Sequence, residues 1–368
     1  AQAFTAETGR IDALSTFDIA AGRAFAEGVL DRLEVRREGG NAFGFLLIDG
    51  LSLREEPVTH ALQDGLGAVP MFGGSAGDDL KFQRTWIFHE GRFHTDSALL
   101  LLLATPLPFR ILRSQHFVAD GERLVVTEVD APQRIVREIN GRPAVQEYAR
   151  LVGVAPEQLT PEHYASWPVV VMIDGTDFVR SIQHANADGS LTFYCAIDEG
   201  VVLRVAHGVD LLARMEAELV DAERELGGIE GMLVCDCILR NLEISRNGKK
   251  AAAGELFQRF NALGFSTYGE QLGGVHINQT LTGIAIGQST EYFTSSSFRP
   301  TRKLAEQAKT GAATVIIGGT ALGMFSTLFP VLAVVVGTIL AFLFASGFDL
   351  SQISLGLYGI AIAAVGML

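Results

Sequence analysis

The sequence predicts a soluble part with an α/β fold (α+β, mixed sheets), built in two portions and followed by C-terminal transmembrane helices. Over the first 287 residues, helix-like segments alternate with short strand-like segments, a pattern typical of mixed α/β proteins. From Thr310 to Phe348 the chain contains no Asp, Glu, Lys or Arg. A run of that length exceeds the roughly 20 residues that a helix needs to cross a bilayer.

The first half of the chain supplies the clearest helix and strand patterns. Residues 18–38 are predicted to be helical, because Phe25, Val29 and Leu30 contribute to an apolar stripe among polar residues. A strand is predicted over 43–50, a second helix ends near Leu66, and the pattern over 132–141 is helix-like. Further strands are predicted over 84–91, 97–104, 109–117 and 122–130.

After residue 167 the pattern returns to short strands separated by Gly, Asp and Asn. Strands are predicted over 168–175, 178–185, 191–198, 201–208, 231–239 and 281–287, with helices over 210–226 and 254–263. We find no internal sequence repeat. The chain therefore combines enough apolar strand and helix surface for a sizeable core.

Charge and cysteine content exclude some classes of protein. The formal net charge is −13, which argues against nucleic acid as a partner, because phosphate binding needs concentrated Lys and Arg. Three cysteines are too few for a disulfide framework and fit a reducing compartment. Cys235 and Cys237 lack the second pair that a zinc site needs, so we expect buried thiols. With no secretory signal at the start, cytoplasmic residence is expected.

A glycine-rich segment is the first candidate binding site. Residues 71–82 read MFGGSAGDDLKF, with Ser75 and Asp78 beside Gly73, Gly74 and Gly77. Glycines bring backbone amides close to a ligand, and such amides can cradle an anionic group. The alternative is a tight connection between strands. The spacing matches neither common nucleotide-binding pattern.

A second polar segment, residues 265–280, reads FSTYGEQLGGVHINQT. If its end is extended, His276, Asn278 and Thr280 share one face and suit a small polar ligand. The alternative is that these groups satisfy loop backbone. The candidate ligand-binding residues in this segment are Tyr268, Glu270, Gln271, His276, Asn278 and Gln279.

A third segment concentrates arginine and histidine around residues 178–208. Arg180 and Arg204 are candidates for clamping a carboxylate, with Asp198 nearby in the sequence. His184 and His207 are candidates for binding a metal or haem, although a lone histidine is more often a core or surface residue. We find no nucleophile, base and acid at a recognisable spacing, and therefore propose no catalysis.

Several of these motifs, taken together, resemble the FIST domain proteins. The matching stretches include FGGSAGDDLKF, INGRPAVQEYARLVG, AIDEGVVLRVAHG, CDCILR and STYGEQLGGVHINQTLTGIAIG. The resemblance covers about residues 1–287 and implies a FIST N-like domain over 1–165 and a FIST C-like domain over 166–287. It implies an intracellular, non-catalytic sensor that binds a small-molecule ligand and acts with a signalling protein such as a histidine kinase or a chemotaxis component.

Some FIST proteins bind haem and sense nitric oxide, so the resemblance also implies haem as a cofactor here. Haem iron needs an axial ligand such as histidine. His276 lies in the most distinctive motif and is the expected haem ligand, with His116, His184 and His207 as alternatives. The ligand itself stays open. A metal-dependent enzyme that uses His276, Glu270 and Asp198 is a further alternative, but no metal-binding spacing supports it.

The C-terminal part resembles another family, the membrane-bound proton-translocating pyrophosphatases. The similarity lies in STEYFTSSSFRPTRKLAEQAKTGAATVIIGGTALGM and GLYGIAIAAVGML. It implies a basic linker over 288–312 and a transmembrane fragment over 313–368, with the basic flank and the sensor on the cytoplasmic side. The chain would then be a chimera, membrane-associated through 313–368. The alternative function is a fragment of a pyrophosphate-energised proton pump without its catalytic acidic motifs.

Overall fold

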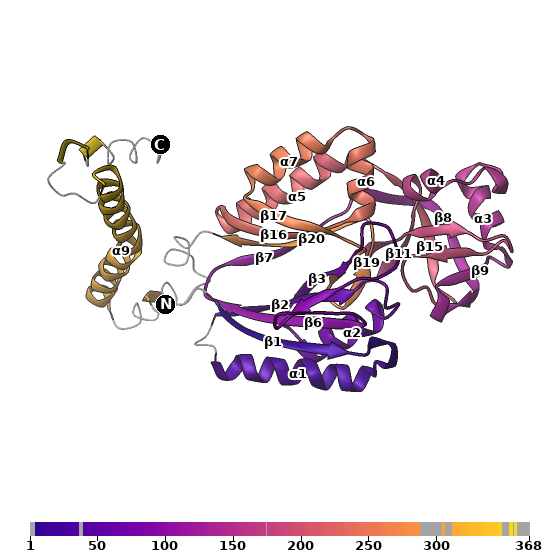
Figure 1. Ribbon diagram of the computed structural model, residues 1–368, viewed down its shortest axis with the longest axis horizontal. Coiled ribbons are helices and arrows are strands. Elements are labelled where there is room, and N and C mark those ends of the chain that lie inside the picture. Colours follow the sequence, from indigo (N-terminus) through magenta and orange to yellow (C-terminus); the bar gives the residue numbers. More distant parts are fainter. Residues whose placement is uncertain are drawn as a thin grey trace. The chain divides into compact units, whose positions relative to one another are not determined.

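The computed structural model describes residues 4–36, 40–173, 175–287, 304–305, 311–347, 353–355 and 357–358. The chain divides into two compact units, Ala1–Gln288 and Ser289–Leu368. The first unit contains three large sheets (Figure 1).

The first sheet has six strands in the order β1-β6-β2-β3-β18-β19. β2 and β3 are parallel, whereas the other neighbours are antiparallel. Helices α1 (Ile19–Arg36) and α2 (Glu55–Leu66) pack on one face of this sheet. The strands are β1 (Thr5–Asp12), β2 (Asn41–Asp49), β3 (Met71–Ala76), β6 (Ser97–Thr105), β18 (Glu270–Leu272) and β19 (Val275–Ile277).

The second sheet has four strands in the order β17-β16-β20-β7. β16 and β17 are parallel, and β20 is antiparallel to both β16 and β7. Its strands are β7 (Phe109–Ser114), β16 (Ile229–Cys237), β17 (Ala262–Thr267) and β20 (Leu281–Gly287). Helices α5 (Leu211–Leu226), α6 (Ile238–Arg246) and α7 (Lys250–Arg259) accompany this sheet. α5 supplies most of the helical side of its core.

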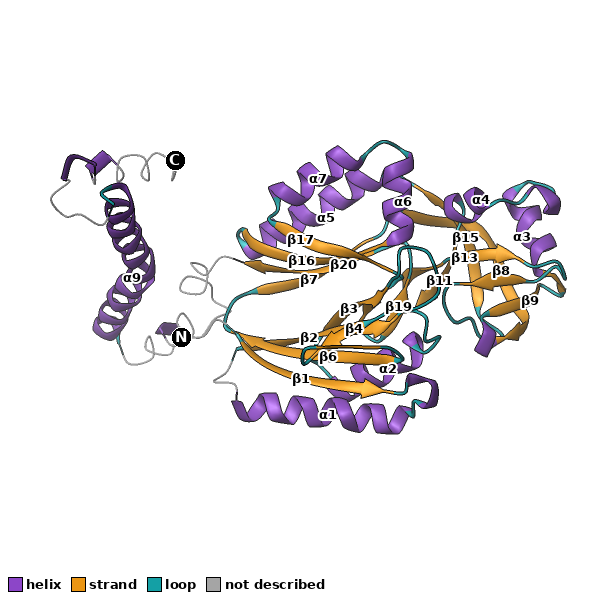
Figure 2. Ribbon diagram, viewed as in Figure 1, coloured by secondary structure: helices purple, strands orange, loops and turns teal. Residues whose placement is uncertain are grey.

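These two sheets stack face to face and form the middle of four layers, helices, sheet, sheet and helices (Figure 2). Phe43, Phe45 and Phe72 of the first sheet meet Cys235 and Ile284 of the second in one buried cluster. Alternate residues along β2 show why both faces are apolar. Leu46 and Ile48 contact the helices, while Phe45 and Leu47 contact the opposite sheet.

The two sheets share one topology. In the first, β1, β2, β3 and β6 follow one another along the chain and lie in the order β1-β6-β2-β3; in the second, β7, β16, β17 and β20 lie in the corresponding order β7-β20-β16-β17. The parallel and antiparallel pairings correspond as well. The first unit is therefore built around two equivalent halves, although the sequence shows no repeat.

A third sheet is inserted between β7 and α5. Seven strands lie in the order β12-β11-β15-β8-β9-β14-β13, and β10 pairs with β9. Helices α3 (Ala144–Val152) and α4 (Pro161–Ser166) add Tyr148 and Tyr164 to its core. The strands are β8 (Phe117–Asp130), β9 (Ile135–Ile139), β10 (Arg142–Pro143), β11 (Val169–Ile173), β12 (Thr176–Arg180), β13 (Ile182–Ala185), β14 (Leu191–Phe193) and β15 (Val202–Gly208).

The remaining elements of this unit are short. β4 (Ile87–His89) and β5 (Arg92–His94) form a separate hairpin. Three 3₁₀ turns occur, η1 (Leu14–Thr16), η2 (Ala131–Gln133) and η3 (Pro156–Gln158). The helix-like pattern over 132–141 was wrong, because Val136 and Ile139 belong to strand β9, which pairs with β8 and β14. The three cysteines are buried free thiols, as expected.

The mixed α/β fold predicted for the N-terminal part is confirmed, but the predicted C-terminal transmembrane helices are not. The second unit contains helix α9 (Ala312–Ala345). Within the described part of the chain, no helix is both long and apolar enough to cross a membrane. The linker predicted over 288–312 lies almost entirely outside the described residues.

Candidate functional site

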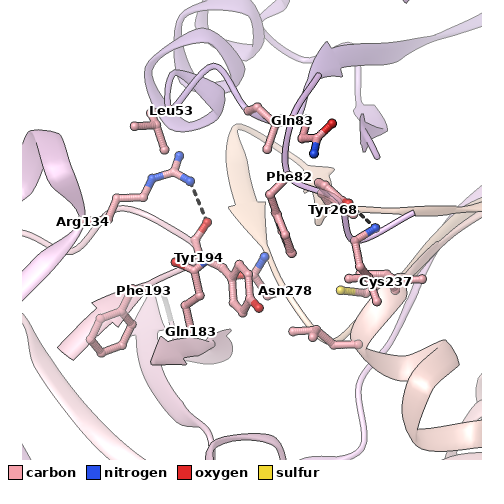
Figure 3. A pocket seen from close by; sticks show the side chains of 15 residues that line it. Leu53, Phe82, Gln83, Arg134, Gln183, Phe193, Tyr194, Cys237, Tyr268 and Asn278 are labelled. Carbon is pink, nitrogen blue, oxygen red and sulfur yellow. Dashed lines mark hydrogen bonds between the residues drawn. The ribbon is translucent and has the colours of Figure 1, made fainter. Parts of the chain in front are cut away.

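A pocket of about 380 Å³ lies where the three sheets of the first unit meet. The parallel pair β2 and β3 ends at Asp49 and Ala76, and the parallel pair β16 and β17 ends at Cys237 and Thr267. Residues just after these ends line the pocket, and ligands of α/β proteins commonly bind outside the carboxyl ends of parallel strands. The lining residues are Gly50, Leu51, Leu53, Leu80, Phe82, Gln83, Arg134, Gln183, Phe193, Tyr194, Cys237, Ile238, Leu239, Tyr268 and Asn278 (Figure 3).

Aromatic rings form one side of this pocket. The ring of Phe82 stacks on Tyr268 with centroids 5.1 Å apart and faces Tyr194 at 6.4 Å. Figure 3 shows the side chain of Phe82 between these two tyrosines. Stacked rings of this kind offer flat, apolar contact surface.

Asp78 and Tyr268 fasten the loop that carries Phe82. The Asp78 carboxylate accepts the backbone N–H groups of Phe82, Gln83 and Arg84 at 2.6–3.0 Å, and the Tyr268 hydroxyl donates to it at 2.5 Å. Burial would raise the pKa of Asp78, but these donors hold it well below its usual range. Burial and the Asp78 charge raise the pKa of Tyr268 to about 12.

Arg134 contributes the charged part of the pocket, but its charge is already paired. Its Nη2 donates to Glu55 at 2.5 Å and to Glu56 at 2.7 Å, and its Nη1 donates to the carbonyl of Tyr194 at 2.7 Å. Burial raises the pKa of Glu55 to about 7. Burial alone would raise the pKa of Glu56 too, but the Arg134 charge and the backbone N–H groups that Glu56 accepts together lower that pKa. Arg134 thus holds α2 and β14 together rather than offering a free cation.

A buried polar cluster on the β18–β19 hairpin adjoins the pocket. Gln271 Nε2 donates to Ser75 Oγ at 2.8 Å and lies 3.2 Å from His276 Nδ1. Gln271 Oε1, His276 Nε2 and Asn278 Oδ1 are buried and have no protein partner. Such groups are uncommon in folded proteins and indicate a bound water or ligand. Of the three side chains, Asn278 reaches the pocket itself.

The backbone before this hairpin requires glycine. Gly269 has φ +124°, and a Cβ there would lie 2.5 Å from His276 Cε1 and 2.7 Å from Asn278 Nδ2. Burial lowers the pKa of His276 to about 4, so the imidazole is neutral near pH 7. The ring is therefore a neutral, tightly enclosed support for the hairpin.

Glu270, Gln279 and Arg180 connect the hairpin to its surroundings. Glu270 accepts the hydroxyl of Thr267 at 2.5 Å and that of Thr280, and burial raises its pKa well above the usual value. Gln279 accepts from Ser181 Oγ at 2.8 Å, and Arg180 Nη1 donates to the His276 carbonyl at 2.7 Å. These residues lie beside the pocket and position its wall.

The glycines of residues 71–82 have a packing role. A Cβ on Gly73 would lie 2.0 Å from the Leu46 carbonyl oxygen, and one on Gly74 would lie 2.4 Å from Thr267 Cγ2. Both residues pair within the sheet, with β2 on one side and β18 on the other. Their backbone therefore does not open onto the pocket, whereas Asp78 acts on it through the loop.

The structure does not bring Arg180 and Arg204 together. Arg180 pairs with Val169 across β11 and β12, whereas Arg204 pairs with the next residue, Val170. Because neighbouring residues of a strand point to opposite faces, the two arginines lie on opposite faces of the sheet. Arg204 instead pairs with Asp177 at 2.7 Å. Asp198 is exposed and does not line the pocket.

The residues around His276 do not fit a haem axial ligand. Its Nδ1 faces Gln271, its Nε2 would lie 2.9 Å from a Cβ on Gly269, and its side chain does not line the pocket. His116 pairs with Glu243 at 3.0 Å, His184 is exposed, and His207 is half-buried. Among the described side chains, no three His, Cys, Asp or Glu residues are grouped to hold a metal ion.

Several pocket residues were not predicted from the sequence. They are Gly50, Leu51, Leu53, Leu80, Phe82, Gln83, Arg134, Gln183, Phe193, Tyr194, Cys237, Ile238 and Leu239. Leu80, Phe82 and Arg134 have positive φ angles of 50–61°, which ordinary propensities do not anticipate. The adjacent Glu55 and Glu56 at the start of a helix were the one available signal, since a buried acid such as Glu55 requires a buried cation.

Comparison with known families finds different matches for the N-terminal and C-terminal parts of the chain. Residues 1–142 match the model of the FIST N domain, and residues 144–272 match that of the FIST C domain. The first part is therefore similar to the FIST N domain followed by the FIST C domain. Its fold continues past residue 272, because β20 lies between β16 and β7.

The C-terminal part matches a different model, that of the inorganic H⁺ pyrophosphatase, over residues 254–368. A candidate K(+)-stimulated pyrophosphate-energized sodium pump of Bacteroides thetaiotaomicron is 68% identical over 88 residues, which are 24% of this chain and 12% of that protein. A K(+)-insensitive pyrophosphate-energized proton pump of Methanosarcina mazei is 44% identical over 79 residues, 22% of this chain and 12% of that protein. The chain thus carries a fragment similar to membrane pyrophosphatases and spans about an eighth of these relatives.

Proposed function

We propose that residues 4–287 form a sensor that binds a small molecule in the pocket between the three sheets. The observation that carries the proposal is Asn278, which lines the pocket although it is 1% exposed and has an unpartnered Oδ1. A buried amide without a partner costs free energy, which a ligand that bonds to it would recover. The FIST N and FIST C matches support a sensory role.

The titratable groups of the pocket favour binding over catalysis. Burial raises the pKa of the Cys237 thiol well above its usual value, so the thiolate that would act as a nucleophile is disfavoured. The Tyr268 hydroxyl donates to Asp78, and His276 lies outside the lining. Non-catalytic sensing, with output to a histidine kinase or a chemotaxis component, is the function that we infer.

Ligand-induced stabilisation of the full chain tests this proposal. A set of small ring compounds with neutral, anionic and cationic groups is screened by thermal unfolding, and binding is confirmed by calorimetric titration. We expect binders whose effect disappears in Gln183→Trp, which fills the pocket, and persists in Leu263→Trp, where the side chain is 78% exposed. Binding that is equally tight in Gln183→Trp and in wild type, or no binding at all, would refute the proposal.

Haem and nitric oxide binding is tested separately by the absorption spectrum of the full chain with added haem. The enclosed geometry of His276 leads us to expect no Soret band that depends on this residue. A band that shifts with nitric oxide and is lost in His276→Ala would show that this expectation is wrong.

A second candidate function is pyrophosphate-driven ion transport, which the identity of 68% over 88 residues favours. The same match covers 12% of the relative's length, so we do not expect the chain to hydrolyse pyrophosphate on its own. Release of phosphate from magnesium pyrophosphate by the purified full chain is the deciding assay. Turnover at a rate above that of the buffer would favour this second candidate.

A further inference from the structure

We propose that the pocket selects a neutral, planar molecule that carries a hydrogen-bond donor beside an acceptor, as a carboxamide or a lactam-type ring does. This inference rests on the proposed function and specifies the chemistry of its ligand. Three features of the lining support it: the balance of charge, the side-chain amides and the aromatic faces.

Charge balance disfavours an ionic ligand. Among the described residues that line the pocket, none is acidic, and Arg134 is the one arginine or lysine. Its Nη2 is shared between Glu55 and Glu56 at 2.5 and 2.7 Å. An anion would have to compete with these two carboxylates, whereas a cation would find no opposite charge, and burial of an unpaired charge is costly.

Side-chain amides dominate the uncharged polar groups of the lining. Gln83, Gln183 and Asn278 all contribute, and Asn278 is both the most deeply buried and the one with an unpartnered oxygen. An amide edge presents one donor and one acceptor, so the ligand group that satisfies both atoms of Asn278 is another amide edge. This holds whichever way the oxygen and nitrogen of the Asn278 amide are placed. A carboxylate offers acceptors alone and an amidinium donors alone, so each leaves one atom of Asn278 unpaired.

The N-terminus of helix α6 adds a site for the ligand's acceptor. Ile238 and Leu239, the first residues of α6, line the pocket. The first turn of α6 contains no acidic residue and has no side-chain cap, in contrast to α2, whose first turn contains Glu55 and Glu56. The helix dipole favours a carbonyl oxygen at this end.

The aromatic side chains of the lining favour a planar ligand. Phe82, Tyr194 and Tyr268 form a continuous stack, with centroids 5.1 and 6.4 Å apart, and Phe193 also lines the pocket. Figure 3 shows Asn278 beside Tyr194 within this ring of side chains. A flat ligand can therefore place its ring against an aromatic face while its polar edge meets Asn278.

Three nearly isosteric probes separate the possibilities: benzamide is neutral, benzoate is anionic and benzamidinium is cationic. Calorimetric titration of each into the full chain should show benzamide binding about tenfold or more tightly than either ion, since an unpaired buried group costs at least that much. Equal or tighter binding of either ion would overturn the inference. So would failure of all three where other compounds bind in a Gln183-dependent way, an outcome that leaves the proposed function intact.

Substitution of Asn278 ties the selectivity to this residue. Asn278→Asp keeps the shape but removes the donor and adds a negative charge, so we expect benzamide binding to weaken and benzamidinium to become the preferred probe. Asn247→Asp adds the same charge at an exposed position outside the pocket and should leave the order unchanged. Gln183→Glu gives a second test should Asn278→Asp fold poorly. An unchanged order of affinity in both pocket variants would refute the assignment.

Discussion

The first unit contains two halves of the same topology, and the central strands of these halves, β2 and β16, end differently at the pocket. Asp49 closes the end of β2 and accepts hydrogen bonds from Leu51 N, Asp96 N and the Thr85 hydroxyl. Asp236, at the corresponding place near the end of β16, instead pairs with the buried Arg240 at 2.7 Å. Each strand end is thus satisfied within its own half, that of β2 by two backbone N–H groups and a hydroxyl, and that of β16 by a charged side chain one helical turn away.

The register of the parallel strands makes this comparison quantitative. Asp49 pairs with Ala76, and Asp236 pairs with Ser266, so Ala76 and Ser266 are corresponding residues. Two residues after them, Asp78 corresponds to Tyr268, and three residues after them, Asp79 corresponds to Gly269. Asp79 and Gly269 both have positive φ, 60° and 124°. The corresponding residues Asp78 and Tyr268 bind each other. The first half provides a loop over the pocket, and the second provides the unpartnered polar atoms.

The largest effect is expected at Gly269, in the second half. Gly269→Ala would place a Cβ within 3 Å of both His276 and Asn278 at a φ that alanine rarely adopts, and should lower the free energy of unfolding by about 3 kcal/mol. Gly231→Ala in β16, where a Cβ meets nothing within 4 Å, is the matched control. Urea unfolding of both variants measures the difference. Similar losses in the two would show that Gly269 is not under special constraint.

A comparable effect is expected from acid, through His276 in the second half. Its pKa is about 4 in the folded protein against a usual value of 6.5. The folded state therefore binds fewer protons than the unfolded state in this window, and the His276 contribution is lost as the pH falls from 6.5 towards 4. The loss should reach about 3 kcal/mol.

Urea midpoints of wild type and His276→Asn at pH 7, 6, 5 and 4 test this acid effect. The free energy of unfolding of wild type exceeds that of His276→Asn by an amount that should shrink by about 3 kcal/mol as the pH falls from 7 to 4. His184→Asn, at an exposed position of β13, provides the control, with no pH-dependent difference expected. A constant gap between wild type and His276→Asn would exclude His276 as the source.

The sequence predicted the second half's share of the site better than the first's. Tyr268, Glu270, Gln271, His276, Asn278 and Gln279 lie in one short polar segment, and the structure brings them together around the hairpin. Phe82, Arg134 and Tyr194 come from three separate segments, and their meeting depends on how the inserted sheet packs against α2. No local pattern contains that long-range information.

One strand prediction succeeded and one pairing of residues failed. Strand β2 was predicted from its nearly continuous apolar run, and seven of its nine residues are buried. Arg180 and Arg204 were paired in the prediction without knowledge of register, and a one-residue difference places them on opposite faces. The repeated topology was also invisible, because the two halves share strand order and not residues.

A smaller effect is expected at the contact between Asp78 and Tyr268. Tyr268→Phe removes a hydrogen bond to a charged group and should lower the free energy of unfolding by about 2 kcal/mol, because the loop residue Leu80 also donates to this hydroxyl at 2.6 Å. A double-mutant cycle with Asp78→Asn isolates the pair. A coupling energy near zero would mean that the loop is held by its own backbone bonds to Asp78.

The smallest effect is expected at Glu270, and its sign depends on pH. Burial raises the pKa of this carboxyl well above its usual value, so the folded state holds a proton that the unfolded state loses above about pH 4.5, and stability falls as the pH rises. Glu270→Gln keeps one acceptor for the threonine hydroxyls that Glu270 accepts and removes this penalty. The variant should therefore gain stability relative to wild type between pH 5 and pH 8, by about 1 kcal/mol or more. Thermal unfolding at the two pH values measures the gain, with Glu255→Gln, at an exposed position of α7, as control. If Glu270→Gln instead loses stability as the pH rises, the carboxylate is ionised in the folded protein and the second half contains a charge that the first half does not.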